Sequence, residues 1–403
     1  MTQKILIKPE TLEHSYIPDD LPRREKERNI IFEQLSDFFK LNEPFFSWII
    51  YGHSGVGKTV LSRRISEDIK KELGNEVFTV YVNCRYSRKI YRILIELVKQ
   101  IERSVPDRGL SKDDLLTILF QLTAEKTGKL LIILDELGTL FVDQEGMKTR
   151  DVLYSISRFS EKYTNLHRKL QLAVIAIVSK THEYTFFQWL DKATRASFIK
   201  YEINLERYSK QDLIEILDYR ASLAFKPGTV FDDAIDLIAS FAADQGEGNA
   251  RIAIDILKNA GRLSDKLSAG YLGVEHVRSV LKYHPDMSRV DSEIFESLDK
   301  HKLVLLLSII RALREFQSSY ITRTQLEQHY HAVCEEYYEK PRKTTQLLRY
   351  LKELGRELHG LVEVEVSGKD QRGRSTRIRI NVPLDSIEKH VLKVLERPIR
   401  GEF

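Results

Sequence analysis

The sequence predicts an α/β domain with a parallel sheet and a phosphate-binding loop, then an all-α segment, then a winged-helix domain. Three observations predict this order. Short apolar runs alternate with amphipathic helices over 1–204, the pattern is purely helical over 205–285, and three helices precede a β-hairpin over 286–403. We therefore expect three domains with these boundaries, and 403 residues is an ordinary length for two or three.

Composition limits the classes of protein to which the chain can belong. Lys and Arg number 63 against 59 Asp and Glu, and a net charge of +4 is too balanced for a histone-like protein. Apolar residues at 42% and charged residues at 30% exclude a disordered chain. Two cysteines, Cys84 and Cys334, fit a reducing compartment. With no signal peptide or membrane span expected, the sequence predicts a soluble cytoplasmic protein.

The first domain is expected to contain four strands. The candidates are β-branched or aromatic runs at 48–51, 77–82, 130–134 and 172–178. Because helical segments separate these runs, we expect a parallel sheet that is buried on both faces. 

The all-α segment carries recognisable helix starts. Ser209 and Asp232 are candidates to cap two helices, and a glycine-rich run at 245–249 precedes a third. 

A phosphate-binding motif follows the first strand. Its pattern G-x-x-x-x-G-K-[ST] is matched by Gly52, His53, Ser54, Gly55, Val56, Gly57, Lys58 and Thr59, and Val60 continues into a helix. The glycines let backbone N–H groups surround a phosphate, Lys58 supplies positive charge, and the Thr59 hydroxyl can bind Mg²⁺. A chance glycine-rich turn is the alternative, which the strand–loop–helix context disfavours. We expect ATP or ADP with Mg²⁺ here.

The strand at 130–134 ends in two acidic residues. Asp135 can hold the water shell of Mg²⁺, and Glu136 can orient and activate an attacking water. An ordinary strand ending in solvated carboxylates is the alternative, and the preceding phosphate-binding loop favours the catalytic interpretation. Arg251 and Arg195 are weaker candidates. The first can reach phosphate across a domain cleft and the second can serve a neighbouring subunit's nucleotide, but each is also explained as a solvated arginine.

Basic residues gather near the C-terminus. Between positions 340 and 379, eleven Lys and Arg oppose five Asp and Glu. Leucines at 347, 351, 354 and 358 form an apolar stripe that leaves Arg349 nearer solvent, while Thr344 and Thr345 begin the helix and can bond phosphate. 

The hairpin tip is also suited to DNA. It carries Lys369, Arg372, Gly373 and Arg374, where glycine permits close approach and arginine can enter a minor groove. A solvated basic hairpin in a protein-binding winged helix is the alternative.

These motifs together resemble the archaeal replication initiators, a family related to the eukaryotic origin recognition complex and its Cdc-type partner. The resemblance begins at 17–25, includes the phosphate-binding loop and the acid pair, and continues through 81–84 and 248–253 to 372–374. It implies an AAA+ ATPase base, a helical lid and a C-terminal winged helix.

The resemblance also implies roles for single residues. Ile17 and Arg23 would lie near the adenine, and Arg251 would be the family's second sensor. The stretch from Arg103 to Lys112 matches, by position, a helical insert that touches DNA in relatives.

Two positions depart from the family pattern. The first sensor, usually Asn, falls on Ser179. The arginine of the family's Leu-Asp-Pro-Arg segment is replaced by Ala193, with Arg195 as a substitute. We therefore expect a weak ATPase in which nucleotide is more a switch than a fuel.

The function implied is an ATP-dependent DNA replication initiator that binds double-stranded origin DNA. Its expected partners are other initiator paralogues on DNA and the replicative helicase, which it would help recruit or load, and its expected place is the nucleoid, away from membranes. Two alternatives stay open: an ATP-binding winged-helix transcription regulator, and an AAA+ clamp-loader-type motor subunit.

Overall fold

The computed structural model describes residues 4–41, 43–163, 170–282, 292–358, 362–366, 376–380 and 384–396. The chain divides into two compact units. One is Ile17–Arg207, and the other joins the N-terminal segment to the residues from Tyr208 onward. Each unit is described by itself.

A five-stranded parallel sheet forms the centre of the first unit. Its order is β2-β3-β4-β1-β5. The bounds are β1 (Phe45–Gly52), β2 (Phe78–Asn83), β3 (Lys129–Asp135), β4 (Gln171–Ser179) and β5 (Tyr201–Leu205). The four expected strands are confirmed. Strand β5 was not expected, because it is a short edge strand whose first residues, Tyr201 and Glu202, are exposed.

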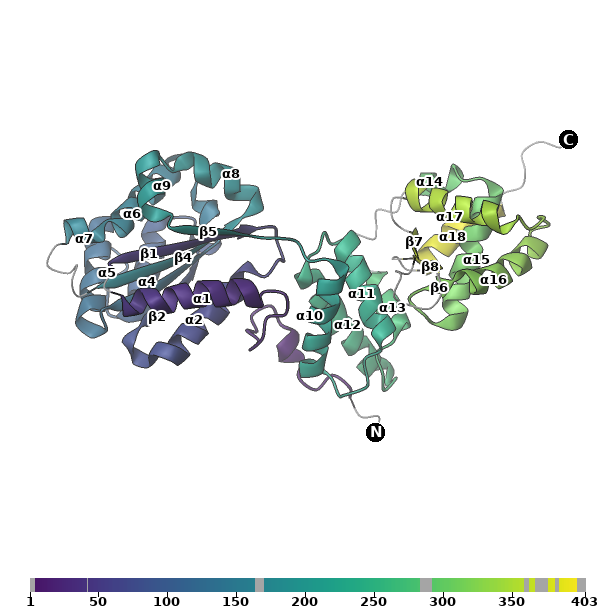
Figure 1. Cartoon of the computed structure of the whole chain (residues 1–403), viewed down its shortest axis with the longest axis horizontal. Coiled ribbons are helices and arrows are strands. Elements are labelled where there is room, and N and C mark those ends of the chain that lie inside the picture. Colours follow the sequence, from purple (N-terminus) through teal and green to yellow (C-terminus); the bar gives the residue numbers. More distant parts are fainter. Residues whose placement is uncertain are drawn as a thin grey trace. The chain divides into compact units, whose positions relative to one another are not determined.

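Helices cover both faces of this sheet (Figure 1). Alternate side chains of β3 point to opposite faces. Leu131 and Ile133 pack with α1 (Glu25–Lys40) and α2 (Lys58–Leu73). Ile132 packs on the opposite face. The helices on that face include α4 (Ile90–Ile101), α5 (Lys112–Lys126) and α6 (Asp143–Ser157). Shorter elements complete the unit: α3 (Cys84–Ser87), η2 (Gly74–Glu76), η3 (Leu137–Leu140), α7 (Phe159–Lys162), α8 (Lys180–Trp189) and α9 (Lys192–Phe198).

Four helices follow in the second unit: α10 (Lys210–Ala224), α11 (Asp232–Asp244), α12 (Ala250–Leu267) and α13 (Val274–Leu281). Ser209 caps α10 in a reciprocal capping box with Asp212, as expected. Asp232 is not a cap, because α11 already begins at this residue and its N-cap, Phe231, offers no side-chain acceptor.

The N-terminal segment packs on these helices, although we grouped it with the first domain. The backbone of residue Leu6 forms a bridge with Phe225, and the short helix η1 (Pro9–Leu12) contacts α10 and α12. Its apolar side chains explain the placement, because Ile5 and Leu12 are buried in the same core as the helices.

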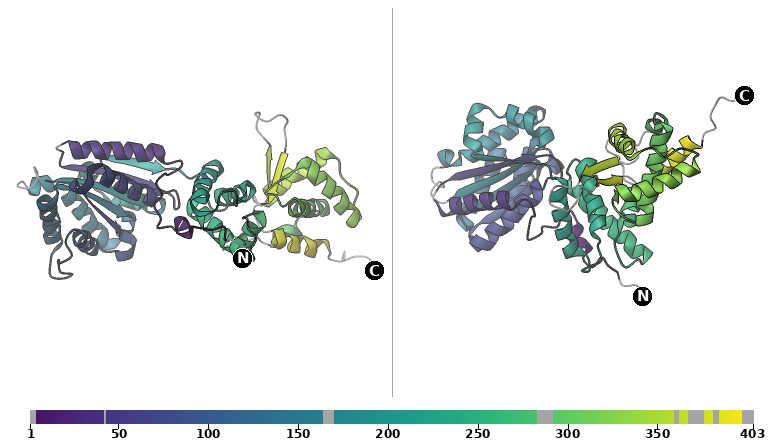
Figure 2. Two further views of the ribbon diagram at one scale, coloured as in Figure 1. Left: turned by 90° about the horizontal axis from the view of Figure 1, so that it is seen from below. Right: turned by 45° about the vertical axis from the view of Figure 1, so that its right-hand side comes forward.

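The last part of the chain is a winged helix, as expected. It comprises α14 (Ser292–Glu296), α15 (Lys300–Phe316), β6 (Ile321–Thr322), α16 (Arg323–Glu336), α17 (Thr344–Glu357), β7 (Val362–Val366), β8 (Thr376–Ile380) and α18 (Leu384–Leu395). Strands β7 and β8 pair antiparallel (Figure 2). Strand β6 adds a short third strand beside β8. Across the described ranges, no helix has both the length and the apolar character needed to span a bilayer.

Candidate nucleotide site and nucleic-acid interface

The phosphate-binding loop lies between the end of β1 and the start of α2. Gly52 adopts φ +148°, and a Cβ there would lie 2.6 Å from the carbonyl oxygen of Leu205. Gly55 and Gly57 also have positive φ angles, of 77° and 92°. The loop therefore needs glycine at these places, and it leads straight into the N-terminus of α2, where backbone N–H groups favour an anion.

Lys58 points back into this loop. The side chain is buried, and Nζ donates to the carbonyl oxygens of Gly52 at 2.8 Å and His53 at 2.6 Å. These bonds place the ammonium within the turn that would surround a phosphate. A charge so placed can counter the outer phosphates of a nucleotide.

Asp135 is a buried carboxylate at the end of β3. Its side chain is 1% exposed, and Oδ2 accepts hydrogen bonds from Thr59 Oγ1 at 3.0 Å and from the Tyr81 hydroxyl at 2.7 Å. The other oxygen, Oδ1, is buried and has no hydrogen-bond partner among the residues described. A buried carboxylate oxygen left this way, beside a hydroxyl whose lone pairs remain available, fits an oxygen-preferring cation such as Mg²⁺.

Glu136, the residue after β3, has an unusual backbone conformation. Its backbone is left-handed, with φ 56° and ψ 33°, a conformation that costs a non-glycine residue about 1–2 kcal/mol. Its carbonyl oxygen accepts from the backbone N–H and the hydroxyl of Thr139, which holds this turn. Strain of this kind is common at functional sites, and it fits the role expected of Glu136.

Arg24 is a residue that we did not predict. It is buried; Nε donates to the Val56 carbonyl oxygen in the phosphate-binding loop at 3.1 Å, and NH2 donates to the Glu206 carbonyl oxygen at 2.6 Å. The predicted neighbour Arg23 is exposed instead, and Ile17 is half-buried. The spacing along the helix could have indicated that Arg24 is buried, because position 24 lies on the same face as buried Ile31, two helical turns later.

The sensor candidates lie on three different elements. Ser179 ends β4, and its hydroxyl is 2.9 Å from that of Thr181. Arg195 is exposed on α9 with its guanidinium 4.8 Å from the ring centre of Phe187. Arg251 is exposed in the first turn of α12, which belongs to the other unit. The roles of these three residues stay predictions.

The helix α17 presents cations in the expected way. The four leucines of its stripe are buried, while Thr344, Thr345 and Arg349 are exposed. Lys352 and Arg356 are exposed as well. The wing candidates Lys369, Arg372, Gly373 and Arg374 lie outside the described residues.

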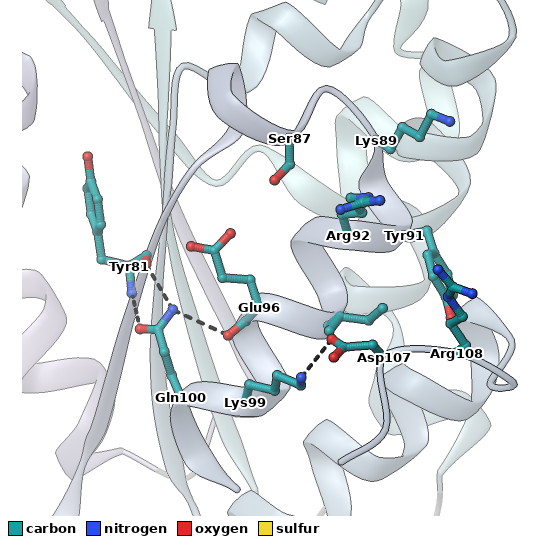
Figure 3. A pocket seen from close by; sticks show the side chains of 11 residues that line it. Tyr81, Ser87, Lys89, Tyr91, Arg92, Glu96, Lys99, Gln100, Asp107 and Arg108 are labelled. Carbon is teal, nitrogen blue, oxygen red and sulfur yellow. Dashed lines mark hydrogen bonds and ion pairs between the residues drawn. The ribbon is translucent and has the colours of Figure 1, made fainter. Parts of the chain in front are cut away.

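The segment from Arg103 to Lys112 joins two helices and is not itself helical up to residue 111. The expected helical insert is therefore a loop here, held to α4 by an ion pair of 2.6 Å between Lys99 and Asp107. Arg103 is exposed and Lys112 begins α5. An open pocket beside the loop is lined by cations that include Lys89, Arg92 and Arg108 (Figure 3).

Three family models match successive parts of the chain. They are an AAA domain over residues 47–182, a Cdc6 AAA+ ATPase-type lid domain over 214–282, and a CDC6 C-terminal winged helix domain over 293–390. A curated relative, "ORC1-type DNA replication protein 2" of Saccharolobus solfataricus, is 31% identical over 387 residues, covering 93% of this chain and 90% of the relative. The chain belongs to the family of ORC1-type DNA replication proteins.

Solved structures agree with this membership of the family. Cdc6p from Pyrobaculum aerophilum superposes with a TM-score of 0.82 at 27% identity, over 98% of this chain and all of that one. The Aeropyrum pernix ORC1 protein in complex with DNA gives a TM-score of 0.60 at 25% identity, over 97% of each chain. The expected resemblance and fold class are confirmed, and the base is an AAA+ ATPase domain.

Proposed function

We propose that this chain is an ATP-dependent DNA replication initiator that binds duplex origin DNA and helps recruit or load the replicative helicase. The observation that supports the proposal is that one chain holds both a glycine-rich loop, with Lys58 directed into it and Asp135 beside it, and a winged helix with exposed cations on α17. The relative solved in complex with DNA supports the DNA half of this proposal.

Nucleotide would act in this protein more as a switch than as a fuel. Lys58 and the loop N–H groups would bind the phosphates, Thr59 and Asp135 would hold Mg²⁺ through direct or water-mediated contacts, and Glu136 would orient water. Ser179 and the absent arginine at Ala193 support slow turnover, with Arg195 as a substitute. Arg251 would report the nucleotide state to the lid.

DNA would be bound at three places: α17, the wing and the loop from Arg103 to Lys112. Threonines at the start of α17 would bond phosphate, and its exposed cations would face a groove. Other initiator paralogues would share the DNA in the nucleoid. A transcription regulator with the same layout is the second candidate, and genome-wide mapping of bound DNA distinguishes origins from promoters.

The nucleotide half is tested by Lys58→Ala. Removing the main counter-charge should abolish tight ATP binding, measured by calorimetry on the full chain. Lys70→Ala is the matched control, since Lys70 is exposed on the same helix, away from the loop, and its ammonium pairs with Glu67 at 3.1 Å. Wild-type affinity in Lys58→Ala, with an unchanged melt, would show that the site is wrongly assigned.

The DNA half is tested by the double variant Lys352→Ala with Arg356→Ala. If both side chains contact phosphates, affinity should fall on every duplex, and the salt dependence should become shallower by roughly one unit per contact. Lys389→Ala with Lys393→Ala, two exposed cations on α18, is the control. DNA affinity is measured by fluorescence anisotropy titration. Equal affinities for the two double variants would favour a winged helix that binds protein instead of DNA.

A further inference from the structure

Tyr81 reaches the nucleotide site from the edge of the sheet. It lies on β2, the strand next to β3, and its backbone pairs in register with Ile133. Its side chain packs on the face covered by α2, where Asp135 is also found. From there the phenol hydroxyl donates to Asp135 Oδ2 at 2.7 Å.

This hydrogen bond determines which carboxylate oxygen is left for a ligand. Thr59 and Tyr81 both donate to Oδ2, so that oxygen is engaged twice, while Oδ1 stays buried without a hydrogen-bond partner in the described parts of the chain. We propose that Tyr81 is a positioning residue, which fixes the Asp135 carboxylate so that Oδ1 is presented to Mg²⁺ or its water shell. The proposal rests on the proposed nucleotide function.

The Tyr81 ring is held in place from α2. The Arg63 guanidinium lies 5.1 Å from the ring centre, in the geometry of a cation–π contact, and Arg63 is one helical turn beyond Thr59. With the ring held in this way, the phenol O–H is directed at Asp135 Oδ2.

The Tyr81 backbone is held from the opposite side by Gln100 on α4. Because β2 is an edge strand, no strand in the described ranges pairs with the outward N–H and C=O of Tyr81. The Gln100 side chain pairs with them instead: Oε1 accepts from Tyr81 N at 3.1 Å, and Nε2 donates to Tyr81 O at 2.9 Å (Figure 3). Gln100 lines the pocket beside Lys99, which pairs with Asp107 in the loop after α4. Asp135 is therefore connected to α4 and this loop through Tyr81 and Gln100.

The test is the magnesium dependence of ADP binding by the full chain. For each variant, the dissociation constant is measured in EDTA and in Mg²⁺, and their ratio reports the metal's contribution independently of turnover. Tyr81→Phe keeps the ring and its contact with Arg63 and removes only the hydroxyl. We expect its ratio to fall by about tenfold, the worth of one hydrogen bond to a charged group, with binding in EDTA unchanged.

Thr79→Val is the matched control. Thr79 is on the same strand and the same face, and its buried hydroxyl has no hydrogen-bond partner within the described chain, so the wild-type ratio should remain. Gln100→Leu is a second variant that leaves every side chain at the metal site intact, and it should lower the ratio less than Tyr81→Phe does.

The outcomes distinguish a failure of the positioning role of Tyr81 from a failure of the proposed nucleotide function. A wild-type ratio in Tyr81→Phe overturns the positioning role, and so does an equal fall in Thr79→Val, which would indicate general damage to β2. If Tyr81→Phe fails to melt as a folded protein, Gln100→Leu decides, and an unchanged ratio there overturns the inference. A wild-type chain that binds no nucleotide, with or without Mg²⁺, overturns the proposed function instead.

Discussion

Asp135 illustrates the cost of burying a carboxylate in the core of a domain. A buried carboxylate is expensive unless its oxygens are paired, and here only Oδ2 is paired among the described residues. Two hydroxyl donors offset part of that cost, since hydrogen bonds to charged groups contribute about 1.5–3 kcal/mol each. Burial of the unpaired Oδ1 still costs free energy, and a bound cation would offset that cost. Binding of nucleotide with Mg²⁺ should therefore raise the stability of the base by mass action.

Glu136→Gln should separate nucleotide binding from turnover. The amide has the shape of the carboxylate but cannot accept a proton, so ATP should bind normally while the remaining hydrolysis is lost. Phosphate release in single-turnover experiments measures the second effect. Glu67→Gln, on the exposed side of α2, controls for the loss of one negative charge. Undiminished phosphate release in Glu136→Gln would remove the residue from its assigned role.

The residues found from sequence and those missed differ in how their positions are fixed. Gly52 to Thr59 are neighbours in the chain, so their spacing alone specifies the loop. Arg24 and Tyr81 reach Val56 and Asp135 from 32 and 54 residues away, and only the packing of α1 and the order of the strands bring them there. The helical phase of position 24 can indicate that Arg24 is buried, but no local pattern specifies which atoms Arg24 or Tyr81 contacts.

At the scale of elements, α17 combines two functions on opposite faces. Its stripe of leucines is buried in the winged-helix core, which fixes the orientation of the helix and leaves Arg349, Lys352 and Arg356 in solvent. The periodicity of 3.6 residues predicted both faces correctly. Strands β5 and β6 were missed, because edge strands of five and two residues carry too short a pattern to stand out.

Leu351→Ala should destabilise the protein, whereas Lys352→Ala should not. Leu351 is 1% exposed, and truncating a buried leucine typically lowers the free energy of unfolding by about 2–5 kcal/mol. The exposed neighbour should change it by no more than about 0.5 kcal/mol. Urea unfolding followed by circular dichroism compares them. Similar losses in both variants would mean that the two faces of α17 are wrongly assigned.

At the scale of the whole molecule, the lid and the winged helix form one compact unit with a continuous apolar core. A buried arginine joins the two parts. Arg379 of β8 is 1% exposed; NH1 donates to Ser240 Oγ at 2.7 Å and lies 3.1 Å from Asp236 Oδ2, both on α11. Ser319 of the winged helix also contacts Asp236. A charged contact of this kind specifies one docking arrangement where apolar packing alone would tolerate several.

A double-mutant cycle tests this contact. Arg379→Met removes the charge but keeps the apolar stem, and Asp236→Asn keeps the shape of the side chain. If the pair contributes as its burial indicates, the two changes should be non-additive, with a coupling of about 1–3 kcal/mol in the free energy of unfolding. Asp236 also pairs with Lys210 at 2.7 Å, so its negative charge keeps one partner in Arg379→Met. This variant should therefore lose less free energy of unfolding than one that leaves a buried charge with no partner. Urea unfolding of the wild type, both single variants and the double variant supplies the four corners. Additivity within about 0.5 kcal/mol would show that Arg379 and Asp236 do not act as a pair, and the docking of the winged helix on the lid would then rest on the apolar core and on other polar contacts, such as that of Ser319.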